Sequence, residues 1–359
     1  MYCEICTMIQ DSSPQRTPLS EIGEFGLIER LTSAVELKQP SSVMGVGDDA
    51  AVMRHDDADT LITTDLLVEG VHFDLAYMPL KHLGYKAAVV NFSDIYAMNG
   101  TPTQITVGLA ASNRFPVEAL EEIYEGLLLA CSHYNVDLVG GDTTSSMSGL
   151  TLAITAVGQV EKDGAIQRGC AQPTDLIVVS GDLGAAYMGL QVLRREKATF
   201  EANPNMQPDL QGNEYVLERQ LKPEARQDIK QLLAELNVTP TSMIDISDGL
   251  SSELLHLCKA SDTGCSIFED KLPIDPSVIT LCEEFGLHPV TPVLNGGEDY
   301  ELLFTVKLED WDQIKGNPNL TAIGHMTAPN GCFLFNKAEQ AIPLEAQGWN
   351  TFDGESVEE

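Results

Sequence analysis

The sequence predicts an α/β (α+β) protein of two domains, and three observations lead to this class. The chain has 359 residues, which at roughly 150 residues per domain leaves room for two hydrophobic cores. Hydrophobic residues make up 43% of it, and its 18 prolines and 29 glycines are dispersed without a repeat, as in globular proteins. Short runs rich in β-branched residues alternate with segments of helical periodicity, which favours α/β units over an all-α or all-β fold.

Strands and helices follow from this alternation in chain order. Short apolar runs predict strands at residues 61–64, 103–110, 137–139, 150–160, 176–180, 242–246 and 301–306. Apolar residues at helical spacing predict helices at residues 80–98, 116–134, 182–195, 223–236 and 248–260. The third of these helices follows a turn of two glycines around Asp182 and Leu183, which supplies an N-cap.

A polar segment at residues 161–174 separates two halves of similar length. It contains two glycines and a proline, so we interpret it as the connection between domains and place the boundary near residue 165. The predicted domains are residues 21–165 and 166–352. A second polar stretch, residues 196–220, contains two prolines and a glycine and predicts a long loop or an insertion in the second half.

The net charge excludes one class of partner. Lys and Arg total 21, and Asp and Glu total 54, so the formal charge is −33. A protein this acidic is poorly suited to neutralise a phosphate backbone, and we expect no nucleic-acid partner. No apolar run approaches the roughly 18 residues of a membrane helix, and the N-terminus lacks the basic and apolar regions of a signal peptide. We therefore expect a cytoplasmic protein without membrane contact.

The eight cysteines are scattered, mostly within apolar stretches, and predict reduced core thiols rather than a disulfide framework. Cys3 and Cys6 have the spacing of half a zinc site, but no second CxxC or HxxxH pair completes it. The sequence therefore indicates no cluster of soft metal ligands.

Acidic residues recur beside Gly, Ser or Thr in six strand-like or turn segments. The six segments are Gly47-Asp48-Asp49-Ala50, Thr63-Thr64-Asp65, Asn91-Phe92-Ser93-Asp94, Gly140-Gly141-Asp142-Thr143, Asp245-Ile246-Ser247-Asp248-Gly249 and Gly296-Gly297-Glu298-Asp299. Taken singly, each is more simply a turn or a helix N-cap, because Asp, Ser and Gly favour those positions. The carboxyl ends of strands in an α/β sheet converge on one crevice, however, and carboxylates gathered there repel one another. The recurrence therefore predicts a bound cation.

The ligand types narrow the choice of cation. Carboxylates and hydroxyls without His or Cys partners favour Mg²⁺, Mn²⁺ or Ca²⁺ over zinc. Mg²⁺ commonly shares its coordination with substrate phosphates, so the pattern indicates phosphoryl chemistry. The chain has neither a GxxxxGK[ST] loop nor the HRD and DFG sequences of protein kinases. Residues 45–50 fit GxGxx[GA], but two carboxylates at the pyrophosphate position argue against a dinucleotide site.

The acidic segments are recognisable as a set. In chain order they read GVGDDAAV, TTDLLVEGVHF, NFSDIYAMNG, VGGDTT, DISDGLSSEL and GGEDYELLF. From about residue 21 to residue 352 the set resembles the thiamine-monophosphate kinase family, within the superfamily of aminoimidazole-ribonucleotide synthetase. The second and last strings are more particular to the thiamine branch, whereas SDG-like and GGD-like elements recur across the superfamily.

The resemblance implies a fold, a reaction and a partner. It implies a two-domain aminoimidazole-ribonucleotide synthetase-like fold, in which the N-terminal sheet dimerises with that of a second copy and ATP lies between the domains. It also implies transfer of the γ-phosphoryl of ATP to thiamine monophosphate, with several Mg²⁺ ions and without a phosphoenzyme. The residues agree with this, since no Cys–His or Ser–His pair marks an activated nucleophile and an ionised phosphate needs no general base.

The resemblance also assigns site residues by position. The implied metal shell comprises Asp48, Asp49, Thr63, Thr64, Asp65, Asp94, Asp142, Asp245 and Asp248. The implied ATP contacts are Tyr124, Gly141, Asp142, Arg168 and Ser247. The implied acceptor pocket contains His72, Glu298 and Trp349, whose ring would stack on the thiazolium or pyrimidine. Simpler roles stay open for Tyr124 as a core residue, Arg168 as a solvated charge, His72 as a packed histidine and Trp349 as an anchor of the C-terminal segment.

Three alternative functions stay open. The nearest is another ATP-dependent member of the superfamily, such as a purine-biosynthesis or selenophosphate synthetase. Cys3 and Cys6 lack the Gly-rich context expected of the latter. A non-catalytic acidic Ca²⁺-binding protein would need DxDxDG loops, which the chain lacks. A metal-dependent phosphohydrolase would differ in consuming ATP without a phosphorylated acceptor.

Overall fold

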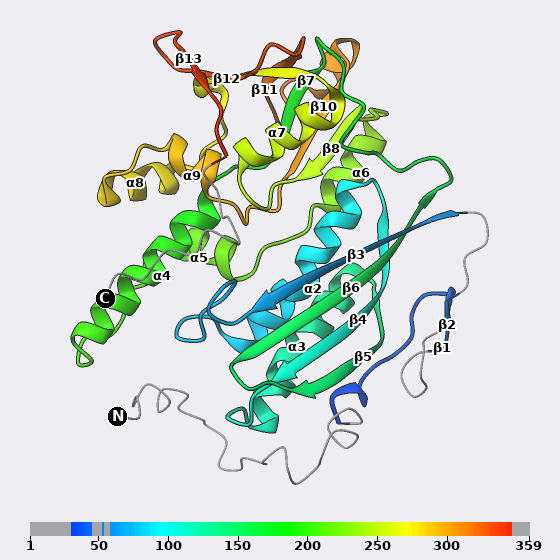
Figure 1. Ribbon diagram of the computed structural model, residues 1–359, viewed down its shortest axis with the longest axis vertical. Helices are drawn as coiled ribbons and strands as arrows, with labels where there is room; N and C mark the ends of the chain where they lie inside the picture. Colours follow the sequence, from blue (N-terminus) through cyan, green and yellow to red (C-terminus); the bar gives the residue numbers. More distant parts are fainter. Residues whose placement is uncertain (1–29, 45–51, 54–57, 347–359) are drawn as a thin grey trace.

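Two separate β-sheets organise the chain, one in each half of the sequence (Figure 1). The computed structural model describes residues 30–44, 52–53 and 58–346. A two-stranded ladder of β1 (Ser42–Met44) and β2 (Val52–Met53) precedes the first sheet. Strands and helices mix in both halves, which is the α/β class that the sequence predicts.

The first sheet has four strands in the order β3-β6-β4-β5. These strands are β3 (Ala58–Val68), β4 (Thr101–Ala111), β5 (Asp137–Ser145) and β6 (Leu150–Glu161). β6 pairs antiparallel with both β3 and β4, whereas β4 and β5 run parallel. A parallel pair requires a crossover, which α3 (Val117–Tyr134) supplies, while α2 (Leu80–Ala97) connects β3 to β4. Each of the four strands contains the segment predicted for it.

Helices α2 and α3 cover one face of this sheet and pack against each other (Figure 1). Two glycines allow the helices to approach closely. A Cβ atom at Gly84 would lie 1.8 Å from the carbonyl oxygen of Ile123, and one at Gly126 would lie 1.9 Å from that of Lys81. Any larger residue at either position would push the helices apart. α2 is buried along most of its length, because it also faces the second half of the chain.

The opposite face of the first sheet is not covered by any helix in the described ranges (Figure 1). Ile62 and Leu66 of β3 are exposed there by 70% and 55%. Side chains alternate along a strand, so Thr64 points to the same face. Asp142 of β5 pairs with Gly108 of β4 and shares that face too. We call this surface, marked by these five residues, the open face.

The second sheet has seven strands in the order β13-β12-β9-β11-β7-β10-β8. Its strands are β7 (Leu176–Ser180), β8 (Ser242–Asp245), β9 (Gly264–Phe268), β10 (Leu302–Val306), β11 (Leu320–Thr327), β12 (Cys332–Phe335) and β13 (Ala341–Pro343). Its α-helices are α4 (Ala185–Ala202), α5 (Glu214–Leu221), α6 (Gln227–Glu235), α7 (Leu250–Ser261), α8 (Pro276–Phe285), α9 (Val290–Asn295) and α10 (Trp311–Ile314). β7, β8 and β10 match predicted strands, whereas β9, β11, β12 and β13 were not predicted.

The long loop or insertion predicted at residues 196–220 is confirmed only for residues 203–213, which contain no helix or strand. α4 continues to Ala202, and α5 occupies the end of the segment. α5 is mostly polar but buries Val216 and Leu217 against α4, so a narrow apolar stripe stabilises it. Tertiary packing of this short stripe outweighs the polar composition on which the prediction relied.

The two halves are joined by hydrogen bonds as well as by the chain. The hydroxyls of Tyr85 on α2 and Tyr134 on α3 both donate to Glu224 Oε2, at 2.6 and 2.7 Å. Glu224 lies between α5 and α6, so this contact fixes the second half against the helices of the first. Among the helices of the described residues, none is long and apolar enough to cross a membrane.

Candidate active site

A cavity of about 660 Å³ lies between the two halves of the chain. Its walls come from the end of β3, the segment before α2, α2 itself, α4, the end of β8 and residues 296–300. Seven of the residues predicted from the sequence line it: Asp65, His72, Asp94, Asp245, Ser247, Asp248 and Glu298. The structure therefore brings together segments that are more than 200 residues apart in the sequence.

Three aspartates from both halves form the acidic cluster of this cavity: Asp65 on β3, Asp94 on α2 and Asp245 at the end of β8. Hydroxyl groups hold two of these aspartates, Asp94 and Asp245, in place. Thr63 Oγ1 donates to Asp94 Oδ2 at 2.6 Å, and Ser93 Oγ donates to Asp245 Oδ2 at 2.6 Å. Thr63 and Asp65 lie two residues apart on β3, so their side chains share the face of the sheet that α2 covers. Thr63 therefore reaches Asp94 on α2.

Burial and mutual repulsion make these carboxylates unusual acids. Burial, with a contribution from Asp94, raises the pKa of Asp65 to about 6. Burial, again with Asp94, raises the pKa of Asp245 to about 7. Burial also raises the pKa of Asp94, although the hydrogen bond from Thr63 and the charge of Arg168 act in the opposite direction. The cluster is therefore a place where negative charge is costly without a cation.

The residues of the cluster fit a hard divalent cation. No lysine or arginine of the described chain forms an ion pair with Asp65, Asp94 or Asp245. Asp94 and Asp245 each accept one hydroxyl bond and keep further acceptor capacity, as does Asp65. A donor set made of carboxylate oxygens, with hydroxyls beside them, is the one that Mg²⁺ prefers.

Ser247 and Asp248 lie in the turn between β8 and α7. The backbone N–H of Asp248 donates to Glu253 Oε1 at 2.9 Å, a contact that fixes the start of α7. Burial raises the pKa of Asp248. The free N–H groups at the beginning of a helix favour anions, so this turn brings both a carboxylate and a helix N-terminus to the cavity.

Glu298 occupies the other side of the cavity, held by two side chains that were not predicted. Lys86 Nζ lies 2.8 Å from Glu298 Oε1, and Gln220 Nε2 donates to Glu298 Oε2 at 2.7 Å. The Lys86 side chain is only 2% exposed and also donates to the backbone oxygen of Gln220 at 3.2 Å. The sequence contains one signal for Lys86, because it is the only lysine inside the apolar helical run 83–90. A lysine buried in such a run needs a partner.

His72 lies near Glu298, and its two ring nitrogens differ in hydrogen bonding: Nδ1 is an acceptor and Nε2 is left as a donor. Its Nδ1 accepts the backbone N–H of Val68 at 3.0 Å, so in the neutral ring the proton is on Nε2. Burial lowers the pKa of His72, while Glu298 acts in the opposite direction and Lys86 adds to the lowering. A neutral donor at Nε2 is suited to a phosphate or a ring nitrogen.

The backbone of residues 297–300 is held in a strained conformation. Gly297, Glu298 and Tyr300 have φ angles of 69°, 59° and 52°, in the left-handed region that non-glycine residues seldom adopt. Two bonds maintain it: Glu298 N–H donates to Ser247 O at 2.7 Å, and Tyr300 N–H donates to Ile246 O at 2.8 Å. This strain fixes Glu298 relative to the β8–α7 turn.

Other predicted residues lie elsewhere in the fold. The side chains of Thr64 and Asp142 belong to the open face, on the opposite side of the sheet from the cavity. Gly141 is on the same strand as Asp142, and a Cβ there would meet Val107 O at 2.0 Å. Tyr124 is buried in the core beneath the sheet, where burial raises its pKa to about 12. Arg168 is exposed, yet its charge acts on both Asp94 and Asp245.

Three predicted residues, Asp48, Asp49 and Trp349, lie outside the described residues. Besides Lys86 and Gln220, the cavity contains Arg194 and Lys197 of α4, which the sequence argument did not single out. Both lie on α4, a helix with an apolar stripe, and charged residues beside such a stripe are ordinary. Their residue types alone therefore gave no signal of a site.

Comparison with known proteins adds a family to this geometry. The family model for "AIR synthase related protein, N-terminal domain" matches residues 47–160. The thiamine-monophosphate kinase of Bacillus subtilis (strain 168) is 34% identical over 339 residues, covering 92% of this chain and 99% of that protein. The thiamine-monophosphate kinase of Aquifex aeolicus is 33% identical over 335 residues, covering 93% and 99%.

Solved structures agree with the sequence comparison. A structure described as "AaThiL complexed with AMPPCP and TMP" superposes with a TM-score of 0.71 at 31% identity, covering 95% of this chain and 100% of that one. The two-domain fold predicted for the chain is thereby confirmed, since the likeness extends over both halves.

Proposed function

The chain belongs to the thiamine-monophosphate kinase family, and from this premise we propose that it transfers the γ-phosphoryl of ATP to the phosphate of thiamine monophosphate. The products are thiamine diphosphate and ADP. One observation carries the proposal: a single cavity places an acidic cluster without ion pairs opposite Glu298 and His72. A phosphoryl donor with its metal fits the first side, and an acceptor with a cationic ring fits the second.

The acidic cluster of Asp65, Asp94 and Asp245 would hold Mg²⁺, together with Asp248 and the sequence-predicted Asp48 and Asp49. The bound ions supply charge neutralisation of the phosphates and of the transferring group. Thr63 contributes by fixing Asp94 through its 2.6 Å bond. The side chain of Thr64 points to the open face, so only its backbone is available on the cavity side.

The residues of the chain act by binding and positioning. The β8–α7 turn with Ser247 presents backbone N–H groups to ATP phosphates. Arg168, exposed next to the cluster, is placed to contact ATP from the connecting segment. Glu298, fixed by Lys86 and Gln220, and the Nε2 proton of His72 orient the acceptor. No residue needs to remove a proton, because the attacking phosphate oxygen is already ionised near neutral pH.

We propose that the enzyme is a homodimer formed through the open face. Ile62 and Leu66 make this face apolar, and an exposed apolar sheet face favours burial against a partner. Gly141 and Asp142 lie on the edge strand β5, across the sheet from β3. In such a dimer they would act at the subunit interface rather than in the cavity of their own chain.

The domain division and the location of the protein are also proposals. Residues up to about 165 contribute to the first sheet and those after it to the second, which supports domains at 21–165 and 166–352. The six cysteines of the described chain are free thiols, as in a reducing compartment. We place the enzyme in the cytoplasm, where ATP is available.

A coupled assay of the purified protein tests the function. With ATP and Mg²⁺, we expect thiamine diphosphate to appear in step with ADP when thiamine monophosphate is added, and unphosphorylated thiamine to be a poor acceptor. A purine-biosynthesis synthetase would instead respond to an aminoimidazole precursor. A phosphohydrolase would release phosphate without any acceptor, and either result would overturn the proposal.

A further inference from the structure

Three cysteines converge in the second half of the molecule, apart from the cavity. The Sγ atoms of Cys258, Cys265 and Cys332 all lie within 4.8 Å of one another, and none of the three forms a disulfide. The expectation that the cysteines form no cluster is therefore wrong for these three. They are separated by up to 74 residues in the sequence, so their spacing gave no signal.

Secondary structure fixes the three sulfurs together. Cys265 on β9 and Cys332 on β12 are direct partners across a parallel strand pair, so their side chains share one face of the sheet. α7 packs on that face and contributes Cys258 from its last turn. The loop after α7 is held by the Thr263 N–H, which donates to the backbone oxygen of Cys258 at 3.0 Å. The arrangement does not depend on a flexible segment.

The environment of the cluster is apolar and nearly dry. Cys265 and Cys258 are 0% and 3% exposed, while Cys332 is half-buried and opens toward the surface. Their buried neighbours in the same core include Leu254, Ile267, Met326, Leu334 and Leu344. Hard cations prefer oxygen ligands and resist losing water, so this surrounding disfavours Mg²⁺ or Ca²⁺.

We propose that Cys258, Cys265 and Cys332 form a binding site for a thiophilic d¹⁰ metal ion, Cu(I) or Zn(II), held by three thiolates. A metal–sulfur bond of about 2.3 Å places three sulfurs around one ion roughly 4 Å apart, within the observed limit of 4.8 Å. On binding, each S–H bond breaks, three metal–sulfur bonds form, and the protons go to solvent. No redox step is involved.

The two ions differ in what else they require. Three sulfurs suffice for Cu(I), whereas Zn(II) takes a fourth ligand, which water would supply on the open side of Cys332. Thr263 Oγ1, two residues before Cys265, is buried beside the Cys258 thiol, and it offers a neutral oxygen for such a water. The site is soft, whereas the acidic cluster is hard, so the two select different ions in one chain.

Metal competition on the reduced, full-length protein tests the site under anaerobic conditions. In one arm the protein competes with a Cu(I)-specific chromophoric chelator, and in the other with a Zn(II)-specific one. We expect one equivalent of one of these ions to bind, and Cys332→Ser to weaken that binding by about a hundredfold or more. Cys131→Ala and Cys282→Ala are matched controls, since each removes a buried thiol outside the cluster, and both should leave the affinity unchanged.

Two further measurements keep the test decisive if Cys332→Ser folds poorly. X-ray absorption of the wild-type protein loaded with the thiophilic ion should report three sulfur ligands, and its Mg²⁺-dependent kinase activity should match that of protein without this ion. Binding of neither ion, binding that survives Cys332→Ser, or binding lost with Cys3→Ser or Cys6→Ser would overturn the proposal. In those cases the three thiols only fill the core.

Discussion

Two groups of buried or half-buried carboxylates differ in what balances their charge. The acidic cluster contains Asp65, Asp94 and Asp245, and its bonds come from the neutral hydroxyls of Thr63 and Ser93. The second group is Asp299 and Glu301. It is paired with Arg219, whose Nη1 lies 2.8 Å from Glu301 Oε1, and with Arg226, which also bonds Glu301.

Burial alone does not separate the two groups. It raises the pKa of Asp299 to about 7, as it does for Asp245. Asp299 is nevertheless satisfied within the chain, because it accepts the Gly184 N–H at 2.8 Å at the start of α4 and lies 3.8 Å from Arg219. The difference is the source of the cation: arginines of the described residues pair with Asp299 and Glu301, whereas no described lysine or arginine pairs with the acidic cluster. Carboxylates without an internal cation are the ones to assign to a ligand.

The largest effect expected from this difference is on activity. Replacing Asp65 or Asp94 by Asn should lower kcat roughly a thousandfold, because each removes charge that stabilises the transferring phosphoryl group. The melting temperature of the metal-free protein should stay equal or rise, since one repulsive charge is gone. Steady-state kinetics and thermal unfolding of the same preparations check both parts.

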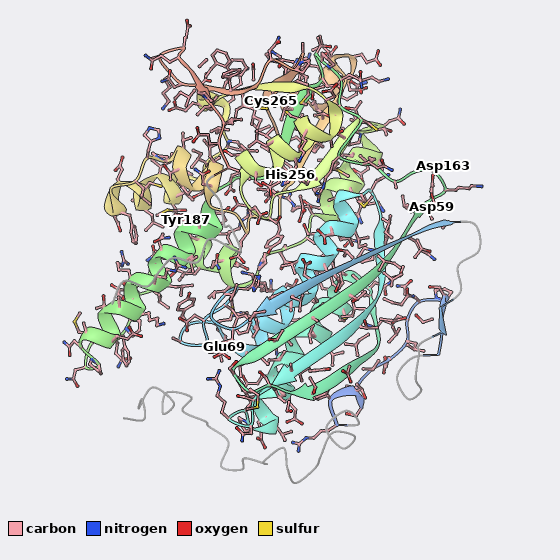
Figure 2. The ribbon with its side chains drawn as sticks, viewed as in Figure 1. Asp59, Glu69, Asp163, Tyr187, His256 and Cys265 are labelled. Atoms are coloured by element: carbon pink, nitrogen blue, oxygen red, sulfur yellow. The ribbon has the colours of Figure 1, made fainter. Side chains whose placement is uncertain are left out.

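Asp59→Asn is the matched control for these variants. Asp59 is an exposed aspartate on the same strand, and Figure 2 shows it beside Asp163, at the other end of β3 from Glu69. It should keep wild-type kinetics. If Asn at both cluster positions retained wild-type rates at limiting Mg²⁺, the metal assignment would be wrong.

The arginine-paired group should respond in the opposite way. Arg219→Met leaves Asp299 without its arginine and Glu301 with only one, and should reduce the free energy of unfolding by about 3 kcal/mol. Urea unfolding measures this. Lys315→Met, which breaks the exposed pair with Asp312, should have no measurable effect. Equal stability of the Arg219 variant and the wild type would remove the distinction between the two groups.

Much of the fold could be predicted because long helices and strands repeat their pattern of apolar residues several times. α2, α3 and β6 are long enough for periodicity to identify them, and their bounds agree with the prediction within about two residues. α5, β12 and β13 are short and partly exposed. Packing against distant elements decides their conformation, and a local pattern does not record it.

The candidate site was predictable where its residues carry their own chemical signal. Asp65 and Asp94 each follow a hydroxyl residue directly, Asp245 comes two residues before Ser247, and the cavity unites all three. Lys86 and Gln220 were missed because their role depends on Glu298, more than 75 residues away from either. Which face of the sheet Thr64 and Asp142 occupy depends on strand register, which the motifs alone do not specify.

A smaller effect is expected where a half-buried carboxylate has a cation and also faces the cavity. Glu298 is such a case, and Lys86 is its positioning residue. Lys86→Met keeps the apolar stem but frees Glu298, so the KM for thiamine monophosphate should rise about tenfold with a smaller change in kcat and in the KM for ATP. Lys86→Arg should restore part of the loss.

Lys81→Met controls for the loss of a lysine on the same helix, since Lys81 forms only an exposed pair with Glu125. It should leave both KM values unchanged. A uniform loss of kcat in the Lys86 variant, with no selective change for the acceptor, would assign Lys86 to the fold rather than to the acceptor pocket.

The smallest expected effect is a pH dependence of stabilisation by Mg²⁺. The folded-state pKa values of Asp65 and Asp245, about 6 and 7, lie above the ordinary value of 3.8. Protonation of these groups therefore favours the folded state, and the stability that they contribute is present below pH 3.8 and lost as the pH rises through 6 and 7.

Mg²⁺ binds the ionised carboxylates and opposes this loss only where they are ionised. Mg²⁺ should thus raise the melting temperature by a few degrees at pH 8 and by little at pH 5, at matched ionic strength. Asp94→Asn should abolish the increment, whereas Asp59→Asn should keep it. An equal increment at both pH values would show that Mg²⁺ acts elsewhere on this acidic chain.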